Sequence, residues 1–543
     1  MYCQLAYICG CIPARIRHAL VDLPETLDET YERTLREINK ADWEFAHRLF
    51  QLVAVAARPL RVEELAELLA FDFKAGPIPK FHEDWRLEDP MHAVLSTCPS
   101  FFTIVDGEIY NPHHEVVQFS HFSVKEFLTS SRLAKANDIN LHRYHISETP
   151  AHTLAASACL GYLLHLDKDV TSKSLRKLPF TEYSAEYWAD HALLEDVSRN
   201  VKDGLKELFD ASKPHLAVCI WISDPGLPSW KRLHPSERSP RPSQLSGTPL
   251  HYAALWGLHS IVELLVDELS MNVNSQDFTD SATPLHLASR EGHIKVARRL
   301  LERDADVKAQ NKAKETQLHV ASQCGCLEIA CMLIECGADV SAQDYVSQTP
   351  LHVASRVGKL EVARMLIECS ASVSAQDNNE RTPLHLVSFP NTDPGIDNSG
   401  CPEVALMLLE HGADVSARDR VSQTPLHLAS LAGKLAVARI LIECGASVSA
   451  QNKDERTPLH MVSFGHLGLD TDNSGYPEVA RMLIERGADV SAQDKFSQTP
   501  LHLASGTGKL EVARMLIECG ASVSAQDRDK QTPLHKALSS NGF

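Results

Sequence analysis

The chain has few aromatic residues, few cysteines and too little positive charge to balance its acidic residues. Phe, Trp and Tyr together make up 6% of the 543 residues, and the formal net charge is −18. Such a chain lacks the clustered Lys and Arg that neutralise phosphates, so we expect no nucleic-acid partner. The longest apolar run, near Leu52 to Ala57, is far below the roughly 20 residues of a membrane-crossing helix, so we expect no membrane span.

Fourteen cysteines in a chain of this length are too dilute for a disulfide scaffold. Four of them recur directly after Leu-Ile-Glu, at Cys336, Cys369, Cys444 and Cys519. This regular placement indicates a position within a sequence repeat rather than pairing between thiols. The pattern therefore predicts reduced cysteines in a cytoplasmic protein.

Motifs for catalysis are also missing. The stretch Gly506-Thr507-Gly508-Lys509 looks like the end of a phosphate loop, but that loop needs Gly at 503 and a hydroxyl at 510, and leucine stands at both. His114-Glu115 has no histidine at 118 to complete a zinc motif, and no Gly-x-Ser-x-Gly elbow occurs. We therefore predict no enzyme activity, no catalytic residue and no cofactor.

The most informative pattern is a repeated tetrapeptide, Thr-Pro-Leu-His, with Gln in place of Pro once. It begins at Thr248, Thr283, Thr316, Thr349, Thr382, Thr424, Thr457, Thr499 and Thr532. Most of the spacings are 33 residues, one is 35 and two are 42. This period, together with Gly-Ala-Asp-Val, resembles the ankyrin-repeat signature from Gly247 onward.

Each part of the repeat has a physical role. Thr and Pro suit the first turn of a helix, and Gly508, like Gly292, Gly325, Gly358 and Gly433, suits the turn between two helices. Lys509 then becomes a solvated residue at the start of a helix. The histidines lie one per repeat, too far apart to share a metal, and we expect them to form hydrogen bonds across the repeat turn.

Two repeats carry about nine extra residues between their helices. The segments 349–423 and 424–498 are duplicates that differ at 24 of 75 positions, including Arg356, Arg420, Lys495 and Phe496. Such changes at exposed places suit a diversifying binding surface, although neutral drift predicts the same. The second insert, at Asp470, opens like a calcium loop but has Arg481 where a bidentate Glu is needed, so we expect no metal site.

Before the repeats the pattern changes to three apolar helices and two strand-like stretches, Ser100–Tyr110 and Val116–Leu128. Three helices with a small β-ribbon predict a winged-helix domain. Its third helix carries Glu63, Glu64 and Glu67 against Arg61, and this acidity argues against a DNA-binding role.

Three segments carry a family resemblance: LPETLDETYERTL, VQFSHFSVKEFLTSS and EYSAEYWADHA. Together they resemble the winged-helix and helical segments of fungal NACHT-type STAND proteins with ankyrin arrays. In that family an NTPase domain precedes the winged helix and works as a nucleotide-dependent switch. The resemblance implies a phosphate contact for His121, with Phe119, Phe127 and Leu128 as core; the alternative is a histidine satisfied within its own domain.

The NTPase itself has no counterpart in the sequence. We expect a truncated relative, a fragment of a split gene, or a chain whose true start lies upstream. The predicted fold is mainly α, a winged-helix and helical region followed by an ankyrin solenoid. The predicted parts are a remnant of the NACHT helical tail (1–20), a winged helix (21–135), a helical linker domain (136–235), a linker (236–246) and about nine repeats, the last incomplete (247–543).

The predicted function is a non-enzymatic protein-interaction module whose array binds a protein ligand and whose winged-helix region couples it to a STAND-type switch. One alternative is the C-terminal part of an NTP-driven ATPase with an upstream P-loop domain and self-association through it; another is a passive scaffold. The ligand is expected on the hairpin tips and the concave first-helix face. The candidate contacts are Trp256, Arg290, Tyr345, Arg356, Arg420, Asp470, Lys495 and Phe496.

Overall fold

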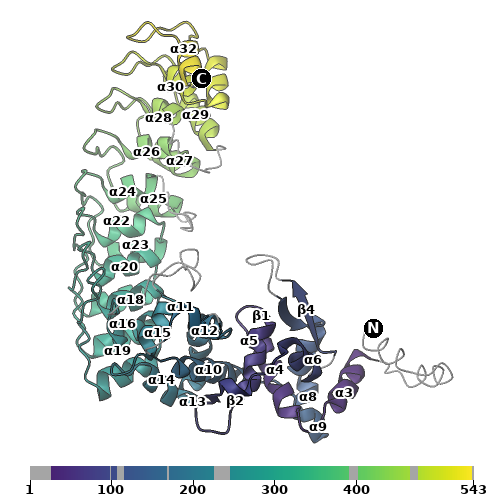
Figure 1. Cartoon of the computed structure of the whole chain (residues 1–543). Helices are drawn as coiled ribbons and strands as arrows, with labels where there is room; N and C mark the ends of the chain where they lie inside the picture. The colour runs from purple at the N-terminus through teal and green to yellow at the C-terminus, as the bar shows by residue number, and fades with distance from the viewer. Residues whose placement is uncertain are drawn as a thin grey trace, which may run out of the picture. The chain divides into compact units, whose positions relative to one another are not determined.

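The computed structural model describes residues 26–97, 100–106, 115–167, 170–175, 177–225, 245–389, 401–464 and 475–540. The chain forms two compact units, Met1–Asn272 and Val273–Phe543. Helices dominate both units (Figure 1), as the sequence predicts. The division falls after α16 and α17, the first two repeat helices, so these helices belong to the same unit as the winged helix.

The first part of unit 1 is the winged helix. Its sheet is three-stranded and antiparallel in the order β1-β5-β4, with Phe102 opposite Phe119. A second ribbon pairs β2 with β3. The elements are α3 (Leu27–Glu37), α4 (Trp43–Val55), β1 (Leu60–Arg61), α5 (Val62–Ala66), η2 (Glu67–Ala70), β2 (Phe71–Asp72), β3 (Lys80–Phe81), η3 (Glu83–Trp85), α6 (Pro90–Thr97), β4 (Phe102–Asp106), β5 (Glu115–Phe119), α7 (Phe122–Leu128), α8 (Ser131–Ala134) and α9 (Ile139–His142).

Aromatic side chains fill the core of this domain. Phe50 on α4 is fully buried, and its ring centroid lies 5.1 Å from that of Phe101 and 6.1 Å from that of Tyr144. Phe127 and Leu128 are also buried, as predicted, whereas Phe119 is half-buried. These contacts close the sheet onto the helices, because edge-to-face aromatic pairs add specific attraction to area burial.

A helical region follows: α10 (Glu148–His165), α11 (Ser172–Leu175), α12 (Thr181–Ala192), α13 (Glu195–Asn200), α14 (Lys202–Leu208) and α15 (His215–Ile222). The middle of α10 is buried on every side, because α4 packs against it from the winged helix and α12 and α14 from the helical region. The unit ends with α16 (Pro249–Leu255), α17 (His259–Glu263) and the π-helical turn η6 (Leu264–Glu268).

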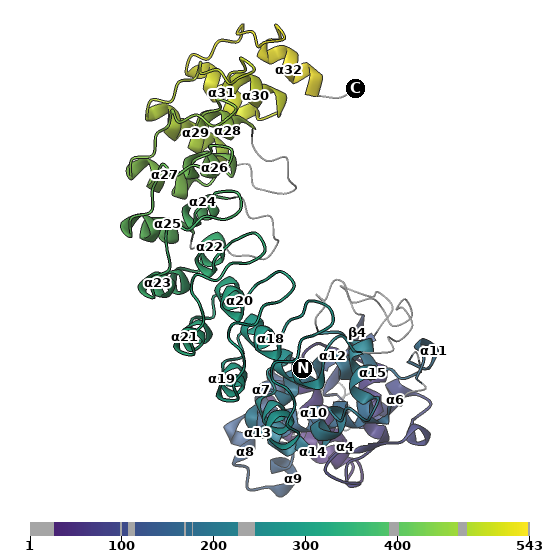
Figure 2. The same cartoon turned by 90° about the vertical axis from the view of Figure 1, so that its left-hand side faces the viewer.

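Unit 2 is a stack of helix pairs, with first helices in one row and second helices in another (Figure 2). The first helices are α18 (Pro284–Glu291), α20 (Gln317–Cys324), α22 (Pro350–Arg356), α24 (Pro383–Ser388), α26 (Pro425–Leu431), α28 (Pro458–Phe464), α30 (Pro500–Gly506) and α32 (Pro533–Ser540). The second helices are α19 (Ile294–Glu302), α21 (Leu327–Glu335), α23 (Leu360–Glu368), α25 (Cys401–Glu410), α27 (Leu435–Glu443), α29 (Gly475–Glu485) and α31 (Leu510–Glu518).

The turns confirm the expected glycine role. Gly508 ends the first-helix turn with a φ of 72°, and Gly292 has a φ of 75°, a region that side chains with a Cβ rarely adopt. The extra residues fall between α24 and α25 and between α28 and α29, as predicted, although 390–400 and 465–474 lie outside the described residues. In the described ranges no helix is both long and apolar enough to cross a membrane.

Candidate functional site

The Thr-Pro-Leu-His histidines join each repeat to the next. At the tetrapeptide that begins at Thr424, the Thr424 N–H donates to His427 Nδ1 at 3.1 Å. Because Nδ1 accepts, Nε2 carries the proton and donates to the carbonyl of Arg456 in the following repeat at 3.0 Å. The same pair of bonds recurs at His286, His319, His352, His385, His460 and His502.

Burial keeps these rings neutral. Loss of solvation lowers the pKa of His286, His352 and His427 to about 4, since the interior disfavours the charged imidazolium. The neutral tautomer is also the form that both hydrogen bonds require. The histidines therefore act in the stack as fixed bridges between repeats, in line with the hydrogen-bonding role that the sequence predicts.

The hairpin tips form a second, continuous line of contacts. At each tip an acidic or amide side chain holds the turn: Asp344 Oδ1 accepts from the N–H groups of Val346 at 2.9 Å and Gln348 at 2.8 Å. The backbone of the tip then bonds to the preceding tip, as in Tyr345 N–H to the Ala313 carbonyl at 2.9 Å. The hairpins, which project along one edge in Figure 1, are thus rigid in backbone and variable in side chain.

Four predicted contact residues lie on these tips. Tyr345 is 66% exposed and Phe496 is 41% exposed. Arg420 and Lys495 are exposed as well, with their N–H groups bonded to the preceding tips at 2.8 and 2.9 Å. The structure therefore brings Tyr345, Arg420, Lys495 and Phe496 onto one edge of the stack.

The other array candidates lie on first helices or outside the described residues. Arg290, near the end of α18, pairs with Glu291 at 2.9 Å. Arg356 ends α22 and is half-buried. Asp470 falls in 465–474, outside the described residues.

Trp256 is placed differently from its prediction as a partner contact. Its ring packs edge-on against Trp188 of α12 at 4.9 Å and against Phe209 at 6.1 Å, all within unit 1. Nearby, Ser260 Oγ lies 3.3 Å from Ser198 Oγ. The ring is half-buried in the junction between the helical region and the first repeat, so we assign Trp256 to internal packing.

The acidic third helix also needs a correction. Glu64 is fully buried, and its carboxylate accepts from Arg58 at 2.7 Å and Arg61 at 2.9 Å. Glu67 is 6% exposed and bonds to Arg86 at 2.8 Å and the Tyr162 hydroxyl at 2.6 Å. Of the three predicted acidic residues only Glu63 is exposed, because these two carboxylates do not face solvent. Glu67 instead ties the winged helix to α10 through Tyr162.

His121 is the N-cap of α7. Its Nδ1 accepts from the Ser123 N–H at 3.3 Å and lies 2.6 Å from Ser123 Oγ, which in turn lies 2.8 Å from the Tyr31 hydroxyl. The ring is exposed, and its centroid lies 4.3 Å from that of Phe122, with the two ring planes tilted by 36°. One nitrogen of His121 is therefore used to start the helix, and the ring remains open to solvent.

Lys509 contradicts the prediction of a solvated residue. It is only 9% exposed, and its Nζ lies 2.9 Å from the ring centroid of Tyr476. Burial lowers the pKa of Lys509 to about 8. The equivalent Lys434 also turns inward and donates to the Val387 carbonyl at 2.9 Å. Both ammonium groups therefore lie against the preceding repeat, to which Tyr476 and Val387 belong.

Sequence analysis also missed two arginine–phenylalanine pairs. The guanidinium of Arg381 lies 5.3 Å from the ring centroid of Phe389, and that of Arg456 lies 5.3 Å from the ring centroid of Phe464. The signal was present, because Arg precedes the Thr-Pro-Leu-His motif only in the two repeats that carry inserts. In each pair the Phe lies eight positions after the Arg, so the two side chains meet only once the first helix of the repeat has formed.

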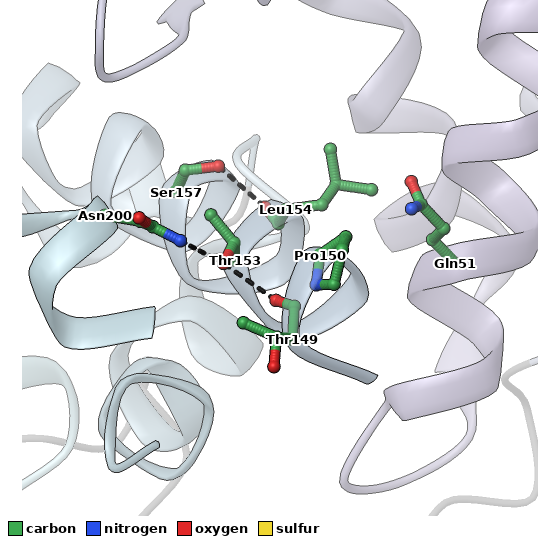
Figure 3. Close-up of a pocket in the computed structure, with 7 residues that line it drawn as sticks. All are labelled: Gln51, Thr149, Pro150, Thr153, Leu154, Ser157 and Asn200. Atoms are coloured by element: carbon green, nitrogen blue, oxygen red, sulfur yellow. Dashed lines mark hydrogen bonds between the residues drawn. The ribbon is translucent and has the colours of Figure 1, made fainter. Parts of the chain in front are cut away.

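A cavity in unit 1 has a volume of about 390 Å³ and lies beside α10. Figure 3 shows Gln51 reaching from α4 toward Pro150 and Leu154, with Asn200 on the far side of α10. Asn200 Nδ2 donates to Thr153 Oγ1 at 3.3 Å. The lining side chains are uncharged, so this cavity suits neutral hydrogen-bonding groups rather than acid–base chemistry.

Comparison with known proteins finds similarity in two parts of the chain. Residues 32–140 match the family described as "GPI inositol-deacylase, winged helix domain". A fungal protein from Monascus ruber, "Azaphilone pigments biosynthesis cluster protein L", is 31% identical over 300 residues, which cover 53% of this chain and 61% of that protein. The ankyrin repeat domain of human ASB11 is 25% identical over 45% of this chain and 99% of its own, with a TM-score of 0.37.

The repeats themselves match the family model described as "Ankyrin repeats (3 copies)". The matched segments are 222–311, 250–344, 318–419, 396–471 and 467–543. Together these segments run without a gap from residue 222 to residue 543, which is more than half of the chain. The chain belongs to the ankyrin-repeat family.

Proposed function

We propose that the protein binds a protein ligand through the hairpin tips of its array, and that the winged-helix region couples this binding to a STAND-type switch in the cytoplasm. Ankyrin repeats are a protein-interaction module, which supports the first part. The observation that carries the proposal is the row of tips with fixed backbones and exposed side chains such as Tyr345, 66% exposed. A rigid scaffold with variable exposed residues binds with little loss of conformational entropy.

The coupling is supported by continuous packing within unit 1. Tyr162 of α10 bonds to Glu67 of the winged helix, and the Tyr183 hydroxyl accepts from the Ala57 N–H at 3.2 Å. From α12, Trp188 continues to Trp256 of the first repeat. A displacement of that repeat would therefore shift the side chains that pack against the winged helix, because close-packed interiors transmit strain.

Binding is tested by capture of proteins from cell extract on the immobilised full chain. The variant Tyr345→Ala/Arg420→Ala/Phe496→Ala removes tip side chains, and Arg364→Ala on the second-helix α23 is the matched control. We expect a set of captured proteins that the tip variant loses and the control keeps, with equal melting temperatures. Identical capture by the unmodified chain, the tip variant and the control would show that the tips are not the binding surface. Such a result would favour a passive scaffold.

The observation that favours the alternative of an NTP-driven switch is the exposed ring of His121. The family resemblance implies that this ring contacts a phosphate. In that alternative an upstream NTPase domain binds the nucleotide whose phosphate His121 contacts. The protein then self-associates through that domain. The gene sequence upstream of Met1 separates the two hypotheses, because an in-frame Gly-x-x-x-x-Gly-Lys-Ser/Thr motif there would favour the nucleotide-dependent alternative. For the chain alone, both hypotheses expect no heat of binding in a calorimetric titration with Mg-ATP.

A further inference from the structure

We propose that Phe464 and Phe496 form one binding site for a partner segment whose apolar side chains are flanked by acidic residues. The inference deepens the proposed function and rests on it, since it names a location within the array and the chemistry of the partner. The two rings come from adjacent repeats: Phe464 ends α28, and Phe496 lies on the next hairpin tip.

One buried ion pair contacts the Phe464 ring and the Phe496 backbone. The Arg456 guanidinium lies 5.3 Å from the ring centroid of Phe464, and its Nε donates to Asp494 Oδ2 at 3.1 Å. The other oxygen of Asp494 accepts from the Phe496 N–H at 2.9 Å. The Asp494 carboxylate is fully buried, and the Arg456 side chain is 18% exposed. The backbone of Arg456 is itself fixed, because its carbonyl accepts from His427.

Both rings nevertheless face solvent. Phe464 is 42% exposed and Phe496 is 41% exposed. The Phe496 carbonyl is bonded from the next tip by the Arg528 N–H at 3.0 Å, and the Lys495 ammonium lies 5.1 Å from the Phe496 ring centroid. Exposed aromatic side chains held by their surroundings are typical binding hot spots, because they bury a large area at a small entropic penalty.

The duplicated repeats provide an internal comparison. Arg381 stacks on Phe389 in the same way, but its carboxylate partner at 2.8 Å is Asp377 of its own repeat. Phe389 is half-buried, and the tip residue equivalent to Phe496 is Val421. The earlier copy therefore has neither the link between repeats nor the second aromatic ring, and only the later copy presents the paired site.

The surrounding charge selects the partner. The tip of Phe496 and the two tips beside it carry the cations Lys453, Lys495, Arg528 and Lys530 and the anions Asp454, Glu455 and Asp529. Asp454 is ion-paired with Lys495, and its own side chain is half-buried. Four cations against three anions give these tips a net charge of +1 (4 − 3) in a chain of net charge −18, and this local excess of positive charge complements acidic residues beside the apolar anchors.

The test uses a phage library of random peptides of about 12 residues, a length that spans roughly two repeats as a helix. The library is selected on the full chain, and the best peptide is made synthetically for fluorescence anisotropy. We expect peptides rich in Leu or Phe next to Asp or Glu. Their affinity should fall at least tenfold for Phe464→Ala and for Phe496→Ala, and should stay within twofold for the matched control Phe389→Ala.

Folding is monitored by the melting curve of each variant, and Phe464→Leu, which keeps an apolar side chain, should retain most of the affinity. Lys495→Glu should weaken binding through its charge. Selected peptides that are basic, or whose binding ignores both phenylalanines, would overturn the inference. If such peptides instead depend on Tyr345 and Arg420, the array remains a protein-binding surface and only this location and chemistry are refuted.

Discussion

Replacing His427 by alanine removes the side chain that bridges two consecutive repeats. The Arg456 carbonyl then loses the Nε2 donor that now lies 3.0 Å away, and the Thr424 N–H loses the Nδ1 acceptor at 3.1 Å. Both losses occur in the core, because His427 is 0% exposed. We expect the variant to unfold from the interface between these two repeats.

The magnitude follows from the contacts. A buried polar group left without its partner costs about 1–3 kcal/mol, and the variant leaves two such groups. Removal of the ring also leaves a cavity, which adds to the loss as in other large-to-small core changes. Water that enters the cavity offsets part of this. We expect a net decrease of about 3 kcal/mol in the free energy of unfolding of the repeats around α26.

The measurement is urea denaturation followed by circular dichroism, with amide hydrogen exchange to locate the change. In repeat arrays stability is a sum of local and nearest-neighbour contributions, so protection should fall first in the repeats that contact α26. His535→Ala is the matched control, because His535 is exposed and makes the same two Thr contacts, to Thr532 at 2.7 and 3.2 Å.

The control should change stability by less than about 1 kcal/mol, as an exposed hydrogen bond contributes little. If His427→Ala and His535→Ala shift the urea midpoint equally, the bridge between repeats does not stabilise the array. Uniform loss of amide protection along the whole stack would likewise refute a local interface.

Three further predictions follow from the same contacts. Burial lowers the pKa of His427 to about 4, so between about pH 6.5 and pH 4 the unfolded chain binds a proton at this residue that the folded chain does not. The stability of the array is therefore full above about pH 6.5 and decreases as the pH falls toward 4. Urea midpoints measured at decreasing pH across this range should decrease steadily. Trp256→Ala should destabilise unit 1 by about 2–3 kcal/mol without changing capture of partners by the array, because its ring packs on Trp188; differential scanning calorimetry and the capture assay check this. Lys509→Met should raise the urea midpoint at pH 7, since methionine avoids the desolvation that lowers the pKa of Lys509 to about 8, whereas Lys434→Met should lower it by removing the bond to the Val387 carbonyl.

The sequence alone determined most of the array. The spacing of Thr-Pro-Leu-His fixes where the first helices begin, and the glycines fix where they turn, because these are local requirements on φ and on the first turn of a helix. The exposed tips at Tyr345 and Phe496 were predictable for the same reason, since hairpin tips project by construction. The winged helix was also predictable, because its helices and strands have clear periodic patterns.

Only the tertiary structure decided what depends on contacts between distant segments. Glu67 looks like part of a charged surface in sequence, yet Arg86 and Tyr162, 19 and 95 positions away, draw it into the interior. Trp256 looks like an exposed aromatic residue of a repeat, but Trp188 covers it from a helix nearly 70 positions earlier. Composition and periodicity report the faces of one element, whereas the burial of a charge or a ring depends on which other element packs against it.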